Sequence, residues 1–276
     1  MTSVDGVEWD AELYAKNTAH HRAYDDHVLD PLDLRPGWQV LDIGSGAGDF
    51  SARLAALVPD GSVLGVDLSR ALVERARASH SDVANLSFET LGAQHLDELV
   101  PSPVGSLQSG PPFDLAISTA TLHWVPGEDH PRLYRTLRQL LRPGGWFRAE
   151  FGGAGQMTDT LEVLNEESVR LGGPRTPWYF PEPVEVADRL VDAGFNLEAG
   201  FVRLVPQLRS VPDAAALRSW LESQVLIAYR PGLGNRYEAF RRIVIERLTD
   251  EGRRHDDSYD QHYVRLDLLC QALENS

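Results

Sequence analysis

The chain has 276 residues and is acidic, because 41 Asp and Glu residues outnumber 26 Lys and Arg residues and give a net charge of −15 at pH 7. This charge argues against a nucleic acid or an anionic membrane surface as a partner, since both repel an acidic protein. The single cysteine, Cys270, excludes an intrachain disulfide. The polar, acidic first ten residues lack the basic and apolar regions of a secretory signal. We therefore expect a cytoplasmic protein.

Apolar periodicity and turn residues divide the first part of the chain into alternating strands and helices. Residues 8–32 are predicted to form one or two amphipathic helices, and residues 101–112, rich in Pro, Gly and Ser, a loop. The expected strands lie at residues 39–43, 62–67, 86–91, 113–118 and 146–151, and the helices between them end near residue 57 or span 69–79 and 131–141. This alternation predicts βαβ units with right-handed crossovers and a largely parallel sheet.

The second half of the chain is less regular. Helices are expected at residues 158–171, 183–193 and 214–248, the last of them broken at 230–234, and strands near 197–206 and 262–272. We interpret residues 1–276 as a single domain. Its core is predicted to comprise about residues 36–152, 195–206 and 262–272, and its cap residues 1–35, 153–194 and 207–255.

Three glycines within residues 44–48 follow an apolar strand and precede a helix, a pattern typical of a turn that a ligand approaches closely. A dinucleotide fingerprint would place its third glycine at position 49, which is Asp49, and the Lys-Ser/Thr pair of a P-loop is absent. Acids at Asp42 and Asp49 would repel a pyrophosphate at the start of the helix. Asp67, at the end of the next strand, is placed to accept hydrogen bonds from a ribose diol. A cationic nucleoside without phosphates fits these constraints, and S-adenosyl-L-methionine is the candidate ligand.

Several segments, taken in order, carry a family resemblance. The chain resembles class I S-adenosylmethionine-dependent methyltransferases at Asp42–Gly48, Val66–Asp67, Phe113–Asp114 and Leu141–Gly145. Within that family, the trans-aconitate and juvenile-hormone-acid methyltransferases are similar at Trp9 and Tyr14, Thr121–Trp124, Pro177–Pro181 and Tyr263–Leu266. The resemblance implies an α/β fold with a Rossmann-like, seven-stranded, mostly parallel sheet whose last strand is antiparallel. It also implies helices on both faces of the sheet and a helical cap.

The resemblance further implies which positions contact S-adenosylmethionine. The predicted cofactor-binding residues are Asp42, Gly44, Ser45, Gly46, Asp67, Leu68, Ala93, Gln94 and Thr119. The acid that the family usually places against the adenine amino group is missing, because Gly92 stands there. The backbone of Ala93 and the side chain of Gln94 or His95 are the candidate replacements.

Aromatic residues and histidines are the candidates for contact with the second substrate. The predicted substrate-binding residues are Tyr14, His20, Trp124, Trp178 and Tyr179. His123 follows the fourth strand, at the sheet edge where catalytic groups gather, and is a candidate general base; simple packing of His123 and Trp124 is the alternative. The cations considered for an anionic substrate are Arg22, Arg175 and Arg230. No metal site is predicted, since His123, Asp129 and His130 lack the spacing of a helical ligand pair.

We therefore expect a methyltransferase that acts on a small molecule by in-line displacement, and the subgroup resemblance favours O-methylation of a carboxylate. A carboxylate needs no base, whereas a hydroxyl, amine or carbon acid would use His123. Two alternatives remain open: an O-, N- or C-methyltransferase of a natural product, and a protein that binds the cofactor but acts as a cyclase, isomerase or binding protein. The sequence does not define the oligomeric state.

Overall fold

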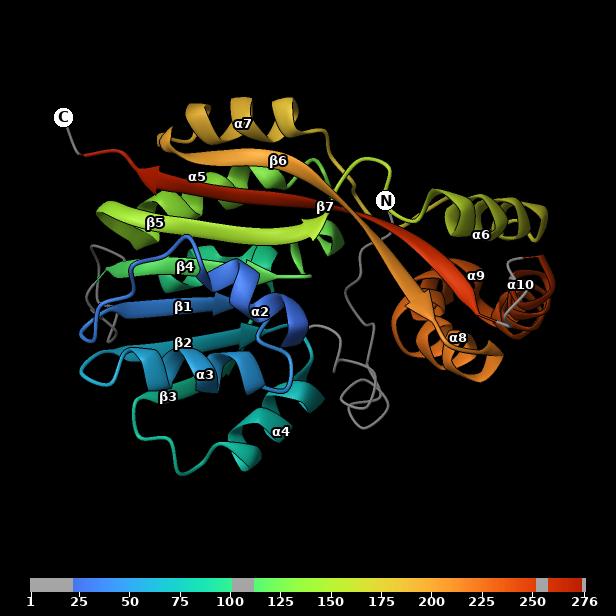
Figure 1. Cartoon of the computed structure of the whole chain (residues 1–276), viewed down its shortest axis with the longest axis horizontal. Helices are drawn as coiled ribbons and strands as arrows, with labels where there is room; N and C mark the ends of the chain where they lie inside the picture. Colours follow the sequence, from blue (N-terminus) through green and yellow to red (C-terminus); the bar gives the residue numbers. More distant parts are fainter. Residues whose placement is uncertain (1–21, 101–111, 252–257, 275–276) are drawn as a thin grey trace.

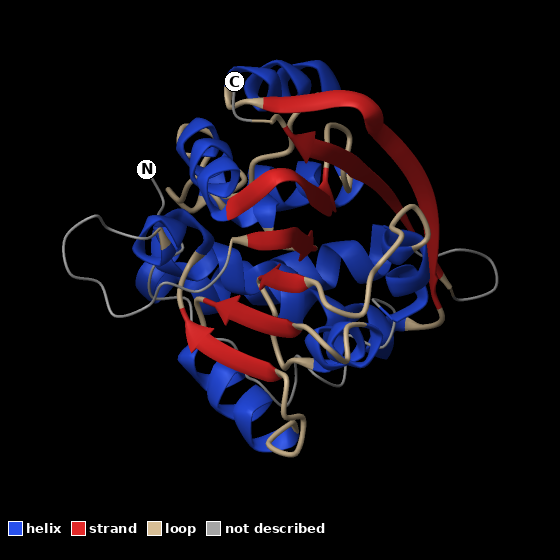
Figure 2. Ribbon diagram, turned by 90° about the vertical axis from the view of Figure 1, so that its left-hand side faces the viewer, coloured by secondary structure: helices blue, strands red, loops and turns tan. Residues whose placement is uncertain are grey.

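The computed structural model describes residues 22–100, 112–251 and 258–274, and these ranges form one sheet with helices on both faces (Figures 1 and 2). The strands are β1 (Gln39–Ile43), β2 (Ser62–Asp67), β3 (Leu86–Thr90), β4 (Phe113–Thr119), β5 (Leu141–Gly152), β6 (Phe195–Val211) and β7 (Tyr259–Ala272). Their order across the sheet is β3-β2-β1-β4-β5-β7-β6.

The pairing confirms the predicted seven-stranded, mostly parallel sheet. Strands β1 to β5 pair in parallel, whereas β7 is antiparallel to both of its neighbours, β5 and β6. The strand order reverses between β1 and β4, because β2 and β3 lie on one side of β1 and the later strands on the other. In open α/β sheets, ligands bind at the carboxyl ends of the strands beside such a reversal.

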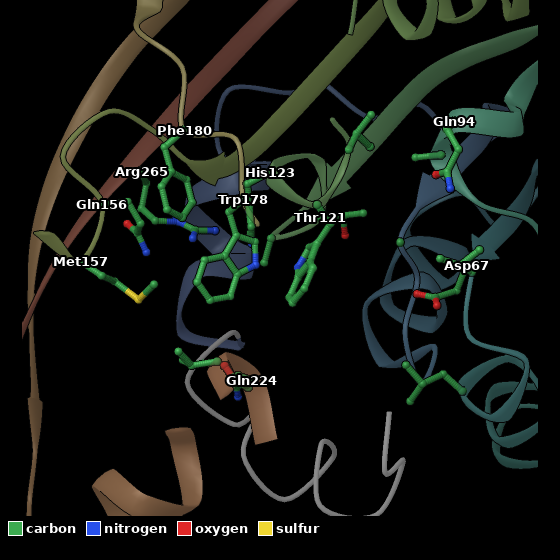
Figure 3. A pocket seen from close by; sticks show the side chains of 18 of the residues that line it. Asp67, Gln94, Thr121, His123, Gln156, Met157, Trp178, Phe180, Gln224 and Arg265 are labelled. Carbon is green, nitrogen blue, oxygen red and sulfur yellow. The ribbon is translucent and has the colours of Figure 1, made fainter. Parts of the chain in front are cut away.

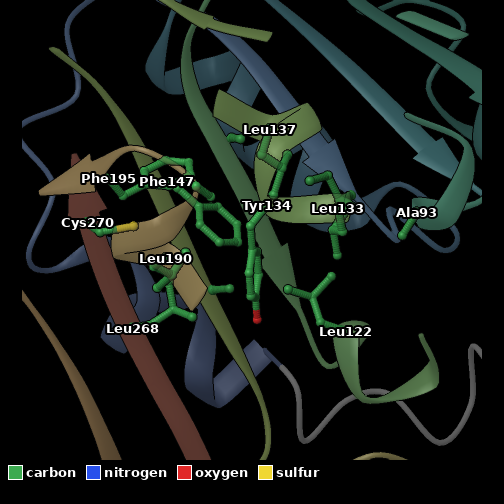
Figure 4. Packing of buried hydrophobic residues seen from close by; sticks show 14 of the residues in the cluster. Ala93, Leu122, Leu133, Tyr134, Leu137, Phe147, Leu190, Phe195, Leu268 and Cys270 are labelled. Atoms are coloured by element: carbon green, nitrogen blue, oxygen red, sulfur yellow. The ribbon is translucent and has the colours of Figure 1, made fainter. Parts of the chain in front are cut away.

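Successive side chains of a central strand point to opposite faces of the sheet, so neighbouring residues enter different cores. Val40 of β1 packs with α2 (Arg22–Leu29) and α3 (Asp49–Leu57) on one face, while Leu41 faces the opposite side. There the core includes the short 3₁₀ helix η1 (Ala93–Leu99), α5 (His130–Leu140) and α7 (Pro183–Asp192). Figure 4 shows Tyr134 and Leu137 of α5 in this core with Phe147 of β5 and Leu190 of α7. Burial on both faces explains why β1 and β4 consist of nearly continuous apolar runs.

A second hydrophobic core lies beyond the end of the main sheet. Strands β6 and β7 continue past their neighbours as a long two-stranded ribbon that reaches this core (Figure 1). The helices around the second core are α6 (Thr158–Arg170), α8 (Ala214–Trp220), the π-helix η3 (Leu221–Val225), η4 (Leu226–Tyr229), α9 (Arg230–Leu233), η5 (Gly234–Arg236) and α10 (Tyr237–Glu251). Their apolar residues gather with Trp178, Val211 and Tyr259.

The secondary structure corrects several expected boundaries. The strands expected at residues 146–151, 197–206 and 262–272 are each longer, because the β6–β7 ladder pairs as far as Val211 and Tyr259 and β5 begins at Leu141. The helix expected over residues 214–248 is divided into α, π and 3₁₀ segments. Helices α2 and α7, which fall in segments assigned to the cap, pack on the faces of the sheet. The half-exposed β6 lacks the apolar run that marks a central strand, so its length was not visible in the sequence.

A buried ion pair explains the position of α2. Arg148 of β5 is fully buried and donates to the carbonyl of Val28 at 2.9 Å and to Oδ1 of Asp267 at 2.5 Å. The same guanidinium therefore links the helix, β5 and β7. Burial lowers the pKa of Arg148, and the neighbouring carboxylate of Asp267 opposes that shift.

Candidate active site

The glycine turn after β1 is fastened to β2 through its backbone amides. The N–H groups of Gly44 and Ser45 both donate to the carbonyl of Val66, at 2.8 and 3.0 Å, and the N–H of Gly46 donates to Oδ2 of Asp67 at 2.9 Å. The turn needs glycine, because φ is +78° at Gly44 and +55° at Gly46. Since the amides that would cradle a phosphate are already bonded to β2, the geometry agrees with the exclusion of a pyrophosphate ligand.

Asp67 ends β2 with both carboxylate oxygens in contact with backbone amides. Besides Gly46 at Oδ2, the N–H of Ser69 donates to Oδ1 at 2.8 Å. Burial raises the pKa of Asp67, and the two N–H donors partly offset that shift. Each carboxylate oxygen has a second lone pair, so the side chain can accept further hydrogen bonds from a ligand.

The loop after β4 approaches the glycine turn closely. A Cβ atom added to Gly44 would lie 1.9 Å from Oγ1 of Thr121, so no side chain fits at this position. Ala120, just before it, adopts a left-handed conformation with φ of +53° and donates its N–H to the carbonyl of Glu150 at 2.7 Å. Backbone strain of this kind is common at functional sites.

One elongated cavity runs from the glycine turn to the second core. We call its two ends the Asp67 end, lined by Gly44, Asp67, Leu68, Ala93 and Gln94, and the Arg265 end, lined by His123, Gln156, Trp178, Phe180 and Arg265. Figure 3 shows Asp67 and Gln94 on one side of this cavity, and Gln156 and Arg265 on the other. The ends meet beside Thr121 and Trp124.

Four polar side chains gather at the Arg265 end. The guanidinium of Arg265 binds the buried carboxylate of Glu150 through Nε and Nη2, the latter at 2.7 Å. The N–H of Gly152 donates to Nδ1 of His123 at 3.2 Å. The side-chain oxygen of Gln156 accepts from the N–H of Val264 at 2.8 Å. The indole N–H of Trp178 is buried and has no hydrogen-bond partner among the described residues.

A model of the methyltransferase domain matches residues 41–147, the part of the chain that carries the glycine turn and Asp67. Trans-aconitate 2-methyltransferase of Deinococcus radiodurans is 42% identical over 141 residues, which are 50% of this chain and 47% of the relative. The chain thus matches about half the length of that relative. The enzyme of the same name from Variovorax paradoxus is 28% identical over 89% of this chain and 90% of its own.

The chain is similar to class I S-adenosylmethionine-dependent methyltransferases. The fold is similar to that of the YcgJ protein of Bacillus subtilis, which superposes with a TM-score of 0.61 at 15% identity, over 92% of this chain and 100% of that one. The expected resemblance to this family, and within it to the trans-aconitate group, is confirmed.

The structure brings most of the residues expected from the methyltransferase resemblance to the cavity. Its lining includes Gly44, Asp67, Leu68, Ala93, Gln94, His123, Trp124 and Trp178. Ser45 and Gly46 are not in the lining and bond to β2 through their amides. At the end of β4, Ala120 and Thr121 line the cavity in place of Thr119. Tyr14 and His20 lie outside the described residues.

Two expected contacts have other partners. The carboxylate of Asp42 accepts a hydrogen bond from Oγ of Ser51 in α3 at 2.5 Å, and Asp42 does not line the cavity. The ring of Tyr179 packs against His130 with centroids 4.8 Å apart, and its hydroxyl accepts from Arg189 at 2.8 Å. Phe180 lines the cavity in place of Tyr179, because successive residues of the extended segment point to opposite sides.

Sequence reasoning predicted His123 and Trp178 but missed Arg265, Glu150 and Gln156 at the Arg265 end. Arg175 and Arg230 do not line the cavity, and the side chain of Arg22 lies outside the described residues. Arg265 is the arginine that lines the cavity instead. It lies within the segment Tyr263–Leu266, which carried part of the family resemblance, but it was not singled out there as a candidate. No sequence signal marked Glu150 or Gln156.

Within the described ranges, no group of three or more His, Cys, Asp or Glu side chains is arranged to hold a metal ion. In the same ranges, no helix combines the length and the apolar character needed to cross a membrane.

Proposed function

We propose that this protein transfers a methyl group from S-adenosylmethionine to a carboxylate of a small acid. The observation that carries the proposal is that one cavity joins a partly buried acid suited to a ribose diol with a cluster of hydrogen-bond donors around Arg265. The names of the relatives from Deinococcus and Variovorax, both trans-aconitate 2-methyltransferases, point to the same class of acceptor.

The Asp67 end fits the cofactor. Asp67 would hold the ribose hydroxyls, and Gly44, which has no room for a side chain, would allow the methionine portion to approach the turn. Asp42, Ser45, Gly46 and Thr119 would support this end from behind the lining. When bound, S-adenosylmethionine supplies an electrophilic methyl group, whose carbon–sulfur bond breaks with its electron pair left on sulfur as the acceptor oxygen bonds to carbon.

The adenine portion would lie between Leu68 and the start of η1, where Ala93 and Gln94 line the cavity. A Cβ atom on Gly92 would lie 3.0 Å from Oε1 of Gln94, so this carboxamide occupies the space next to the missing acid. A carboxamide can accept from the adenine amino group and donate to a ring nitrogen. We therefore assign to Gln94 the role that an acid usually has in this family.

The Arg265 end fits an anionic acceptor. Arg265 offers positive charge, and Gln156 and Trp178 offer N–H donors, in a pocket whose lining also includes several aromatic rings. His123 and Trp124 would flank the point where the acceptor meets the cofactor. The chain's contribution to rate is alignment of the acceptor oxygen with the methyl group in a site with little water. Tyr14 and His20 remain candidates for binding the substrate, and Tyr179 for supporting this end through His130.

Product chemistry tests the proposal. The full chain would be incubated with methyl-labelled S-adenosylmethionine and matched panels of mono-, di- and tricarboxylic acids, their amides, phenols and amines. We expect labelled products only from acids, and we expect mild alkali to release the label, because esters hydrolyse and methyl ethers and amines do not. Label found only in alkali-stable products, or no transfer to any acid, would contradict the proposal. The Asp67→Ala variant, which lacks the ribose acceptor, is the matched control for enzyme-dependent transfer.

A further inference from the structure

His123 is held from behind by the backbone of β5. The N–H of Gly152 donates to Nδ1 at 3.2 Å, and the ring lies between Trp124 and Phe180, each with a centroid separation of 5.8 Å. Gly152 has no room for a side chain, since an added Cβ would lie 2.5 Å from the ring of Phe180. Because a backbone N–H can only donate, Nδ1 must carry a lone pair, and in the neutral ring Nε2 then carries the proton.

Gln156 is oriented in the same way by β7. Its Oε1 accepts from the N–H of Val264 at 2.8 Å, at the point where the ladder between β5 and β7 ends. The acceptor atom of the carboxamide is thus used inside the protein, and the NH₂ group is the part left to meet a ligand. Gln156 is 4% exposed, so its side chain has little freedom to turn over.

Two further groups at the Arg265 end, the guanidinium of Arg265 and the indole of Trp178, are also hydrogen-bond donors. Arg265 can only donate, and Glu150 holds its guanidinium through Nε and Nη2. The N–H of Trp178, buried without a partner among the described residues, also can only donate. Backbone amides of β5 and β7, at the point where the ladder between them ends, therefore turn two side chains of the cavity that could accept, His123 and Gln156, into donors as well.

We infer that His123 is a hydrogen-bond donor that positions an already ionised acceptor, and is not a general base. A base would need its lone pair at Nε2 and its proton at Nδ1, where that proton would face the N–H of Gly152. An ionised carboxylate carries the electron pair that forms the new bond, so no proton is released and His123 stays neutral. This inference deepens the proposed function and rests on it for the identity of the acceptor. The tautomer of His123 does not depend on the proposed function, because it follows from the contact with Gly152.

The tautomer can be measured without turnover. Long-range proton–nitrogen NMR spectra of the full chain labelled with ¹⁵N-histidine distinguish a protonated from an unprotonated ring nitrogen. We expect His123, assigned by comparison with His123→Gln, to have its proton on Nε2 at neutral pH. His130, whose pKa is lowered to about 4 by burial, serves as a neutral reference in the same spectra. A proton on Nδ1 of His123 would overturn the inference even if the protein methylates acids.

Two substitutions separate the donor role from the base role. His123→Gln places an NH₂ group near the position of Nε2, whereas His123→Asn keeps an acceptor for Gly152 but is too short to reach the acceptor. We expect His123→Gln to retain activity within about tenfold of wild type, and His123→Asn to raise the KM for the acid by at least about tenfold, as for one hydrogen bond to a charged group. The pH–rate profile of His123→Gln should keep the shape of the wild-type profile. The exposed His262 lies outside the cavity, so His262→Gln is the matched control.

A general base would give different results. Both variants would then lose about 10²–10⁴ in kcat, and the limb of the pH profile that belongs to His123 would disappear. That result would overturn the inference. The absence of methyl transfer to any acid would instead contradict the proposed function, while the NMR measurement would still report the tautomer.

Discussion

The backbone N–H of Gly46 donates to Oδ2 of Asp67 at 2.9 Å and joins the turn after β1 to the end of β2. One carboxylate thus holds the turn in place and faces the cavity beside it. This double role makes Asp67 sensitive to substitution, and it makes the affinity for the cofactor depend on pH.

Replacement of Asp67 by Ala should abolish cofactor binding that calorimetry can measure. The substitution removes the ribose acceptor and leaves the N–H groups of Gly46 and Ser69 without their partner. Because burial raises the pKa of Asp67 above its usual 3.8, wild-type affinity should fall as the pH is lowered through that raised pKa, where the carboxylate becomes neutral. Asp60→Asn, in an exposed turn, controls for the change in net charge. Near-normal affinity of Asp67→Ala would remove Asp67 from the site.

Gly92→Asp should strengthen cofactor binding. The atoms nearest to the added Cβ would be the flexible ends of Gln94 and Leu68, at 3.0 and 3.1 Å, and the carboxylate would return an acid to the side proposed for the adenine amino group. We expect affinity to rise about threefold to tenfold, in line with one additional charge-assisted hydrogen bond. Gly92→Ala, which adds the Cβ alone, is the control. Equal or weaker binding by Gly92→Asp than by Gly92→Ala would argue against adenine at this position.

Trp178→Phe should weaken acceptor binding as well as the fold. The substitution keeps an aromatic ring but removes an N–H that has no partner among the described residues, so its loss leaves no protein acceptor unpaired. We expect the KM for the acid to rise about tenfold and the free energy of unfolding to change by about 1–2 kcal/mol from lost packing. Trp38→Phe is a matched control, since both tryptophans are 7% exposed and Trp38 lies in the core with α2 and α3. Unchanged KM in Trp178→Phe would exclude a contact with the acceptor.

Substitutions in the ion pair of Glu150 and Arg265 should show that its effect on stability is distinct from its effect on acceptor binding. Arg265→Met leaves Glu150 buried without its partner and should lower the free energy of unfolding by about 3–5 kcal/mol. The double variant Glu150→Gln/Arg265→Met should recover most of this stability yet remain unable to bind the acid. Denaturant unfolding and acceptor KM measure the two effects. Arg70→Met breaks the exposed pair with Glu74 and should cost less than about 1 kcal/mol. Restored acceptor binding in the double variant would contradict the role of Arg265.

His130 should make the protein less stable in acid. Its Nε2 bonds to the carbonyl of Leu122, which begins the turn η2 (Leu122–Trp124) that carries His123, and burial lowers its pKa to about 4 from the usual 6.5. The unfolded chain therefore binds a proton that the folded chain rejects, and about 3 kcal/mol of stability present above pH 6.5 is lost as the pH falls toward 4. Unfolding curves of wild type and His130→Gln between these pH values should show a steeper loss in wild type. His262→Gln should keep the wild-type slope, and an equal slope in His130→Gln would contradict the assignment.

The part of the site that the sequence determined is local. The apolar run before Gly44, the spacing of the glycines and the acid at Asp67 predicted the strand, the turn and the kind of ligand, because each depends on residues close together in the chain. The parallel sheet followed from the alternation of strands and helices, and the structure confirms it. Even Gln94, which we propose as the replacement for the missing acid, was a candidate through the family resemblance and its position close to Gly92.

Only the tertiary structure decided the Arg265 end. Glu150 and Arg265 are separated by 115 positions and meet because β7 inserts antiparallel beside β5. The partners of His123 and Gln156 are the backbone amides of Gly152 and Val264, at the point where the β5–β7 ladder ends, and no residue pattern reveals these contacts. Phe180, and not Tyr179, lines the cavity, because the ring of Tyr179 packs against His130 on the other side of the segment. Short-range patterns thus fixed the cofactor end, whereas contacts between distant segments fixed which atoms face the acceptor.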